Sequence, residues 1–157
     1  MKLGIIFTLA LAISIPALAQ ENDPSPHTAA EIQQHAAPLI DKAKASSTGQ
    51  ATDVLDDLPT ARTLLVVRVK TGQAERHLLW GDQMVILSGN ITLVTGGVMQ
   101  DEKPNGTLQG ESLATSITGG KEITLHPGDI VHIPHSVPHW VKLAPGTTAT
   151  YLVFKEK

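Results

Sequence analysis

The chain has 157 residues, which is enough for one domain with a single hydrophobic core. Apolar residues make up 41% of it, and a formal net charge of −3 without a basic patch predicts no nucleic-acid partner. It contains no cysteine, which excludes disulfides, thiolate metal ligands and a cysteine nucleophile.

Residues 1–19 have the pattern of a secretory signal peptide. Lys2 supplies a positive charge, an apolar run follows, and Ala17-Leu-Ala19 is typical of a cleavage site. A retained anchor is the weaker alternative, because the apolar run is shorter than the ~20 residues that span a membrane. We therefore expect cleavage before Gln20, a periplasmic or secreted protein, and no membrane association after cleavage.

Residues 20–59 predict a polar leader followed by a helical arm. Thr28 and Glu31 have the spacing of a capping box, and apolar residues then recur at helical spacing. Pro38 removes a helix hydrogen bond, which predicts a kinked helix or two short ones ending before Gly49. The apolar stripe is expected to pack on the outside of the following domain, or against a partner subunit in a homodimer.

After an acidic connector at residues 53–59, the pattern changes to short β-branched runs separated by turn signals. The expected strands are residues 64–69, 84–87, 91–95, 112–117, 122–125, 130–133, 140–143 and 148–154, with a polar loop at 101–110. Many short strands of this kind predict an all-β sandwich or barrel over residues 60–157. Closure into a small barrel leaves an interior wide enough for side chains or one small ligand.

The stretch from Pro127 to His139 combines turn signals with a short strand. Pro127-Gly-Asp129 predicts a tight turn, and Pro134 should end the β-branched strand that follows. Pro138 stiffens the turn that delivers His139 to the next strand. A rigid loop that presents one imidazole suits a metal or proton-transfer site, because little ordering is needed when the ligand arrives.

The same stretch resembles the second conserved motif of the cupin superfamily, G-x5-P-x-G-x2-H-x3-N. Gly128, Pro134 and His139 match it, whereas Ser136 replaces the middle Gly and Leu143 the final Asn. The resemblance implies a small, single-domain, exported cupin. Its fold would be a single cupin-type β-barrel (a double-stranded β-helix, or jelly roll) with an N-terminal helical extension.

The first cupin motif, G-x5-H-x-H-x3-4-E-x6-G, fits the chain in two registers. With Gly89 as the final Gly, Asp82 takes the acidic position, and Glu75 and His77 take the two His positions. This register resembles cupins that read A-E-x-H-x4-D. In the other register His77 is the first His, and Gln83 takes the acidic position.

We prefer the first register because it leaves three oxygen or nitrogen donors, whereas the second puts Leu79 at the second His position. The resemblance then implies a divalent metal site at Glu75, His77 and His139, with Asp82 as a fourth ligand. Such a set suits Fe(II), Mn(II), Ni(II) or Zn(II). The alternatives are barrel-lining histidines, a salt bridge from Glu75 to an arginine, and a turn-capping Asp82.

Gln83, His132, His135 and Trp140 are candidates for the cavity or its rim, although His132 could equally face solvent and Trp140 could belong to the core. Three functions fit the sequence. The first is a metal-dependent cupin enzyme, an oxidoreductase such as a dioxygenase or else an isomerase, acting on a small oxygenated substrate. The others are a metal-free barrel that binds a small molecule without turnover, and an assembly role for the helical arm. No residue identifies a catalytic base.

Overall fold

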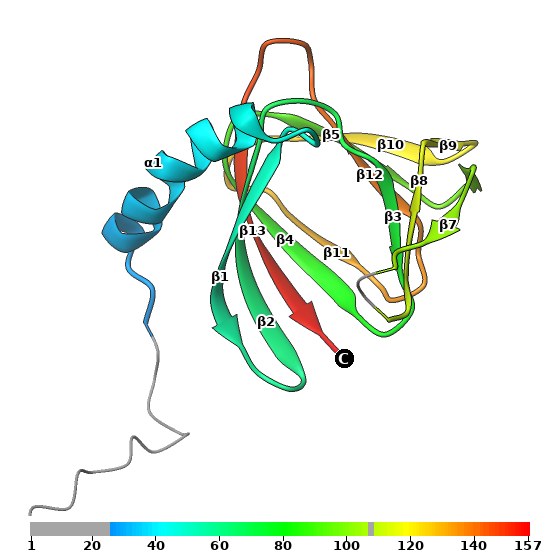
Figure 1. Ribbon diagram of the computed structural model, residues 1–157, viewed down its shortest axis with the longest axis horizontal. Helices are drawn as coiled ribbons and strands as arrows, with labels where there is room; N and C mark the ends of the chain where they lie inside the picture. The colour runs from blue at the N-terminus through cyan, green and yellow to red at the C-terminus, as the bar shows by residue number, and fades with distance from the viewer. Residues whose placement is uncertain (1–25, 107–108) are drawn as a thin grey trace, which may run out of the picture.

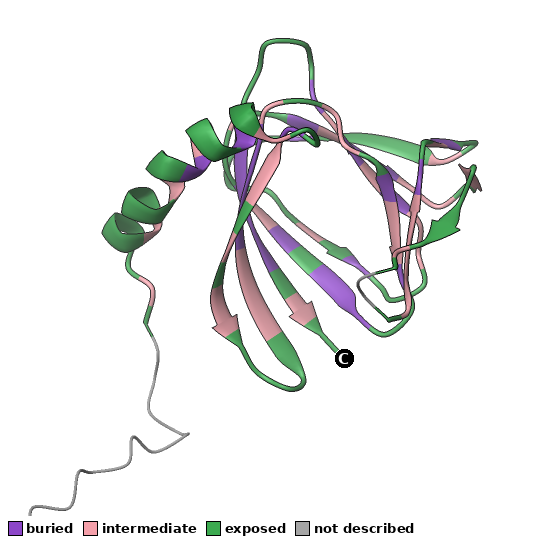
Figure 2. Ribbon diagram, viewed as in Figure 1, coloured by how far each residue is buried: buried purple, intermediate pink, exposed green. Residues whose placement is uncertain are grey.

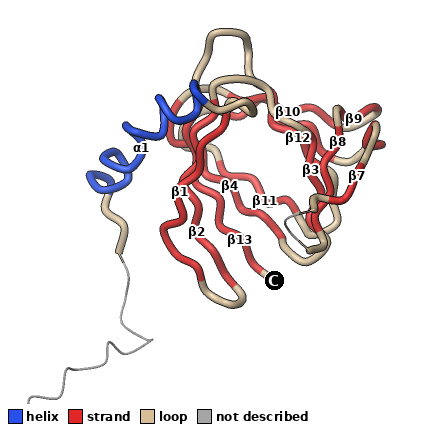
Figure 3. Tube along the Cα trace, viewed as in Figure 1, coloured by secondary structure: helices blue, strands red, loops and turns tan. Residues whose placement is uncertain are grey.

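The computed structural model describes residues 26–106 and 109–157. These residues form one helix and thirteen strands (Figure 3). In chain order they are α1 (Ala29–Ala45), β1 (Gln50–Asp57), β2 (Ala61–Arg68), β3 (Ala74–His77), β4 (Gly81–Ser88), β5 (Ile91–Thr95), β6 (Val98–Gln100), β7 (Lys103–Pro104), β8 (Glu111–Ala114), β9 (Ser116–Thr118), β10 (Lys121–Leu125), β11 (Ile130–Ile133), β12 (His139–Lys142) and β13 (Ala149–Glu156). The expected signal peptide, residues 1–19, lies outside the described residues.

Two large antiparallel sheets face each other (Figure 1). The strand order is β1-β2-β13-β4-β11 in the five-stranded sheet and β10-β5-β12-β3-β8-β7 in the six-stranded sheet, and β6 and β9 form a small third sheet. This arrangement confirms the predicted all-β fold of the jelly-roll type with an N-terminal helix. Within the described part of the chain, no helix is long and apolar enough to cross a membrane.

The core lies between the two large sheets, and strand alternation builds it. On β4, Met84 and Ile86 are buried while Gln83 and Leu87 are exposed, as the two-residue period of a strand requires. Figure 2 shows buried segments alternating with exposed ones along the strands of both sheets. The main core cluster joins residues of both sheets: Val66, Met84, Ile86, Ile91, Leu93, Leu125, Ile133, Val141, Leu143, Ala149, Tyr151 and Val153.

Helix α1 lies against the outer face of the five-stranded sheet, beside β1 and β2 (Figure 1). Leu39 and Ala43 are buried against Leu65, Val67 and Leu152 of that sheet. The capping box predicted at the start of the helix is present, with the Thr28 hydroxyl accepting from the Glu31 backbone N–H. The helix therefore packs on its own barrel, the first of the two expected locations for its apolar stripe.

The helix continues through Pro38 as one element and ends before Gly49, so of the two alternatives two short helices are excluded. Packing of the apolar stripe on the sheet stabilises the helix beyond what local propensity allows. Residues 53–59 are also not a connector, because the strand Gln50–Asp57 pairs with β2. Its acidic residues are compatible with a strand because they have partners: His27 for Asp56, His35 for Asp53 and Arg62 for Asp57.

Candidate metal centre

Two neighbouring strands of the six-stranded sheet supply three of the predicted metal ligands. Glu75 and His77 lie two residues apart on β3, so their side chains leave the strand on the same face. His139, at the start of β12, pairs directly with Glu75 across the ladder. The donor atoms of the three side chains all lie within 4.8 Å of one another. Strand pairing therefore brings together residues separated by more than half of the barrel domain.

The loop before β12 holds His139 in a defined orientation. The His139 Nδ1 lies 3.2 Å from the Val137 carbonyl, which accepts its proton and leaves Nε2 for the site. Ser136 has a φ of 67°, a left-handed conformation, and its N–H donates to the His77 carbonyl over 2.7 Å. The loop of the second motif is thus tied to the strand that carries the first.

Asp82 reaches the same group from the opposite sheet. Its Oδ2 lies 3.4 Å from Nε2 of His77 and 3.8 Å from Nε2 of His139. Its Oδ1 accepts a 2.6 Å hydrogen bond from the Lys155 ammonium on β13. Asp82 therefore joins the predicted ligands, but it also has a close cationic partner that the sequence analysis did not foresee.

His77 is the least satisfied member of the group. Its ring is buried, and neither nitrogen has a well-aligned hydrogen-bond partner among the described residues. Carboxylate oxygens nevertheless surround it: Glu111 lies 3.2 Å from Nδ1, and Asp82 and Glu75 lie 3.4 and 3.6 Å from Nε2. Buried polar atoms rarely stay unpaired without a functional reason. The imidazoles of His77 and His139 and the carboxylates of Glu75 and Asp82 form a donor set that fits a divalent transition metal.

The electrostatics of the group separate the two histidines. Burial disfavours a charged His77, but the carboxylates of Asp82 and Glu111 outweigh it and raise the pKa of His77 to about 9. Burial lowers the pKa of His139, and Glu75 and Asp82 only partly offset it. Burial would raise the pKa of Asp82, yet His77 and Lys155 hold it at about 2. Without a metal, protonated His77 supplies the positive charge that the surrounding carboxylates require.

The geometry matches the first of the two motif registers. Asp82 is buried in the group, whereas Leu79 and Gln83, which the second register requires, are exposed. Gly89, the final Gly of the first register, has a φ of 71°, and a Cβ there would lie 2.1 Å from the Thr148 carbonyl oxygen. Only glycine fits that position.

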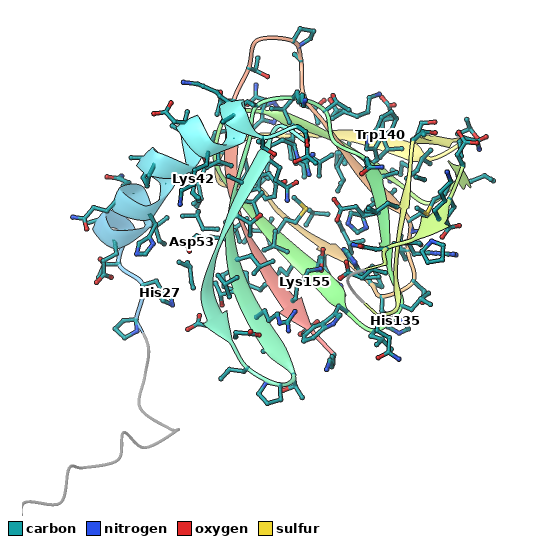
Figure 4. All side chains as sticks on the ribbon, viewed as in Figure 1. His27, Lys42, Asp53, His135, Trp140 and Lys155 are labelled. Carbon is teal, nitrogen blue, oxygen red and sulfur yellow. The ribbon has the colours of Figure 1, made fainter. Side chains whose placement is uncertain are left out.

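The four candidates for the cavity or rim lie elsewhere. Gln83 and His132 are cross-strand partners on the outer face, because alternation from buried Asp82 turns them outward. His135 is exposed at the edge of the molecule (Figure 4). The Trp140 indole N–H donates to the Gly72 carbonyl over 2.7 Å. None of these four side chains lines the interior cavity.

A cavity of about 70 Å³ adjoins the metal-ligand group between the sheets. The residues that line it are Gln50, Thr52, Leu64, Val66, Arg68, Glu75, Asp82, Met84, His139, Val141, Tyr151, Val153 and Lys155. Figure 4 shows Lys155 in the space between the sheets. The polar members Arg68, Tyr151 and Lys155 were not predicted from the sequence. The signal for them was present, because each interrupts or closes an apolar strand at an inward position.

No family model matches the chain, and no curated relative matches it. Solved structures do. An oxalate oxidase matches with a TM-score of 0.51 and 13% identity, over 72% of this chain and 53% of that chain. An Fe(II) form of HppE matches with a TM-score of 0.50 and 17% identity, over 68% and 49%. This chain therefore spans about half the length of either protein, and identities this low show the fold alone. By this likeness and its own topology, the chain has the cupin fold.

Proposed function

We propose that the chain is an exported cupin-fold protein that holds a divalent metal ion at Glu75, His77 and His139, with Asp82 alongside. In the adjoining cavity it binds or transforms a small oxygenated molecule. The observation that carries this proposal is the convergence of the three donors within 4.8 Å, with the buried His77 ring surrounded by carboxylates but without a well-aligned hydrogen bond among the described residues.

The donor set supports a metal of the Fe, Mn, Ni or Zn type, because imidazole and carboxylate ligands suit these ions and no thiolate is present. Oxalate oxidase has been solved with glycolate, and HppE with Fe(II). A bound metal would supply Lewis-acid or redox chemistry here. The chain's own residues would orient the ligand through Arg68 and Tyr151 and exclude water with the apolar cavity walls.

A metal-free ligand-binding barrel is the second candidate, and one observation favours it. Protonated His77 already balances the carboxylates of Asp82 and Glu111, and Arg68 lies 3.8 Å from Glu75. The group can therefore reach charge balance without an ion. In that case the cavity would still bind a small molecule, but without metal-dependent turnover.

Metal analysis of the purified full chain separates the two candidates. We expect about one equivalent of metal after incubation with Fe(II), Mn(II), Ni(II) or Zn(II). A His77→Ala, His139→Ala double variant should hold none. The matched control is a His132→Ala, His135→Ala double variant, which also removes two imidazoles but only exposed ones. Equal loading of both double variants, or metal-free wild type after every incubation, would overturn the metal site.

Export and a homodimer are also part of the proposal. Export rests on residues 1–19, and N-terminal sequencing that starts at Gln20 would support it. A homodimer is supported by the exposed Leu87, Ile130 and Phe154 on the outer face of the five-stranded sheet. The mass of the protein in solution tests whether this face forms an interface.

A further inference from the structure

The cavity has a cationic end that the metal-ligand group does not require. Arg68, the last residue of β2, lines the cavity and is only 3% exposed. A buried guanidinium is costly unless it is paired with an anion. The nearest carboxylate, Glu75, lies 3.8 Å from Nη2, longer than the ~2.7–2.9 Å of a charge-assisted hydrogen bond. Among the described residues, the anionic partner of Arg68 is therefore Glu75 alone, in an ion pair too long for a charge-assisted hydrogen bond.

Two neutral residues hold Arg68 in place beside the cavity. The Arg68 Nε–H donates to the Tyr151 hydroxyl over 3.2 Å, and Nη2 donates to the Gln50 side-chain oxygen. Both partners also line the cavity. The Tyr151 oxygen accepts from Arg68, so its own O–H is free to donate to a ligand. Arg68 and Tyr151 therefore place a guanidinium and a hydroxyl side by side in the cavity lining.

The charges around the cavity also favour an anionic ligand. Arg68 and Lys155 carry two positive charges, and Glu75 and Asp82 carry two negative ones, so the lining is balanced. Glu111 beside His77 adds a third carboxylate, so a divalent metal in place of the His77 proton would leave an excess of one positive charge, which favours an anionic ligand. The remaining walls are apolar, from Leu64, Val66, Met84, Val141 and Val153, so they accommodate a short carbon chain. The volume of about 70 Å³ suits a ligand of a few carbon atoms, and Arg68 and Glu75 also line a larger neighbouring pocket of about 640 Å³.

We infer that the ligand of this cavity is a small carboxylate, whose carboxyl group binds Arg68 and Tyr151 while another of its oxygens faces the metal-ligand group. This inference deepens the proposed function, because the contact between the ligand and the metal-ligand group rests on the proposed metal site. Arg68 and Tyr151 are thus specificity-determining residues, and Glu75 lies between the carboxylate site and the metal site.

Binding of glycolate, compared with glycolamide, tests the inference. The two molecules have nearly the same size, but only glycolate carries a charge. Calorimetric titrations would use the metal-loaded protein and the chelator-treated protein. On the wild type we expect glycolate to bind roughly tenfold or more tightly than glycolamide, the effect of one charge-assisted hydrogen-bond pair.

The decisive variant is Arg68→Gln, with Arg62→Gln as the matched control. Arg62 lies on the same strand but is partly exposed and paired with Asp57. We expect Arg68→Gln to keep its metal and to lose glycolate affinity roughly tenfold or more, while Arg62→Gln changes neither. If Arg68→Gln does not fold, Tyr151→Phe takes its place, because it keeps the ring and should lose roughly threefold to tenfold.

The outcomes separate this inference from the proposed function. Metal loading without any preference for glycolate, or a preference that survives the substitution, overturns the inference alone. A preference that depends on Arg68 in protein that never binds metal supports the carboxylate site and overturns the metal site. Equal loss of metal and glycolate in Arg68→Gln overturns the inference, because Arg68 would then act only by positioning Glu75.

Discussion

His77 lies between two carboxylates, with Glu111 beside Nδ1 and Asp82 beside Nε2. In the metal-free protein a proton on this ring neutralises part of their charge. A metal ion at Nε2 would take over that role, so proton and metal compete for one imidazole. The protonation of His77 in the metal-free protein can therefore be followed through the pH dependence of its stability.

We expect the metal-free protein to lose stability as the pH rises from about 6.5 to about 9. The pKa of His77 in the folded chain, about 9, lies above the value of 6.5 for an isolated ring. Its contribution is therefore fully present below about pH 6.5 and is lost as the pH rises through about 9. Urea unfolding of the chelated protein across this range measures the trend.

The control for this pH dependence is His77→Gln, which removes the titrating ring and should give a flatter profile. Asp82 contributes in the opposite direction, because its pKa is lowered to about 2 and its effect is lost only in strong acid. Parallel profiles for wild type and His77→Gln would contradict the assignment of the shift to His77.

Ser136 is a second residue with a local consequence. It has a φ of 67°, where the resembled cupin motif has glycine. A side chain in this conformation costs about 1–2 kcal/mol. Ser136→Gly should therefore be more stable than Ser136→Ala by about 1 kcal/mol, since both lose the hydroxyl and only alanine keeps the Cβ. Denaturant midpoints of the two variants measure this difference, and equal midpoints would show that the loop relaxes.

At the scale of elements, α1 is part of the barrel's hydrophobic structure. Leu39 and Ala43 cover Leu65, Val67 and Leu152 on the outer face of the five-stranded sheet. Removing the helix would expose these side chains to water. If α1 served only for assembly, its removal would leave the barrel unchanged. The packing of α1 on the sheet therefore argues that assembly is not its only role.

Leu39→Ala should lower the free energy of unfolding by about 2–4 kcal/mol, the usual cost of a cavity left by a buried leucine. Leu39 is 3% exposed. Leu58→Ala is the matched control, because Leu58 is 58% exposed in the turn between β1 and β2 and should cost less than about 0.5 kcal/mol. Denaturant unfolding of both variants gives the comparison. Similar small losses would mean that α1 detaches readily from the sheet.

The sequence predicted most elements because hydrophobic alternation and turn residues are local signals. The resemblance to the cupin motifs also selected Glu75, His77 and His139, which the structure brings together on β3 and β12. The strand β1 was not predicted, because the acidic residues of this strand have partners that no local pattern shows. Asp53 pairs with His35, 18 residues earlier, and Asp57 pairs with Arg62, 5 residues later. Arg68 was not predicted as a cavity residue for a similar reason: its partners are Gln50 and Tyr151, 18 and 83 residues away.

At the scale of the whole molecule, the candidate site lies where the two sheets meet. The six-stranded sheet provides β3 and β12, and the five-stranded sheet provides Asp82 on β4 and Lys155 on β13. The facing sheets also enclose the main core cluster. The same packing that stabilises the barrel thus fixes the distances within the site.

The position of β13 between β2 and β4 has a kinetic consequence. Residues 149–156 must pair with both strands before the five-stranded sheet is complete. Such non-local pairing is slow to form, and it keeps a growing chain from closing the sheet early. During synthesis β4 cannot yet lie beside β13, so Lys155 and Asp82 meet only afterwards. The proposed metal site therefore gains the ion pair between Lys155 and Asp82 only after β13 has paired with β4.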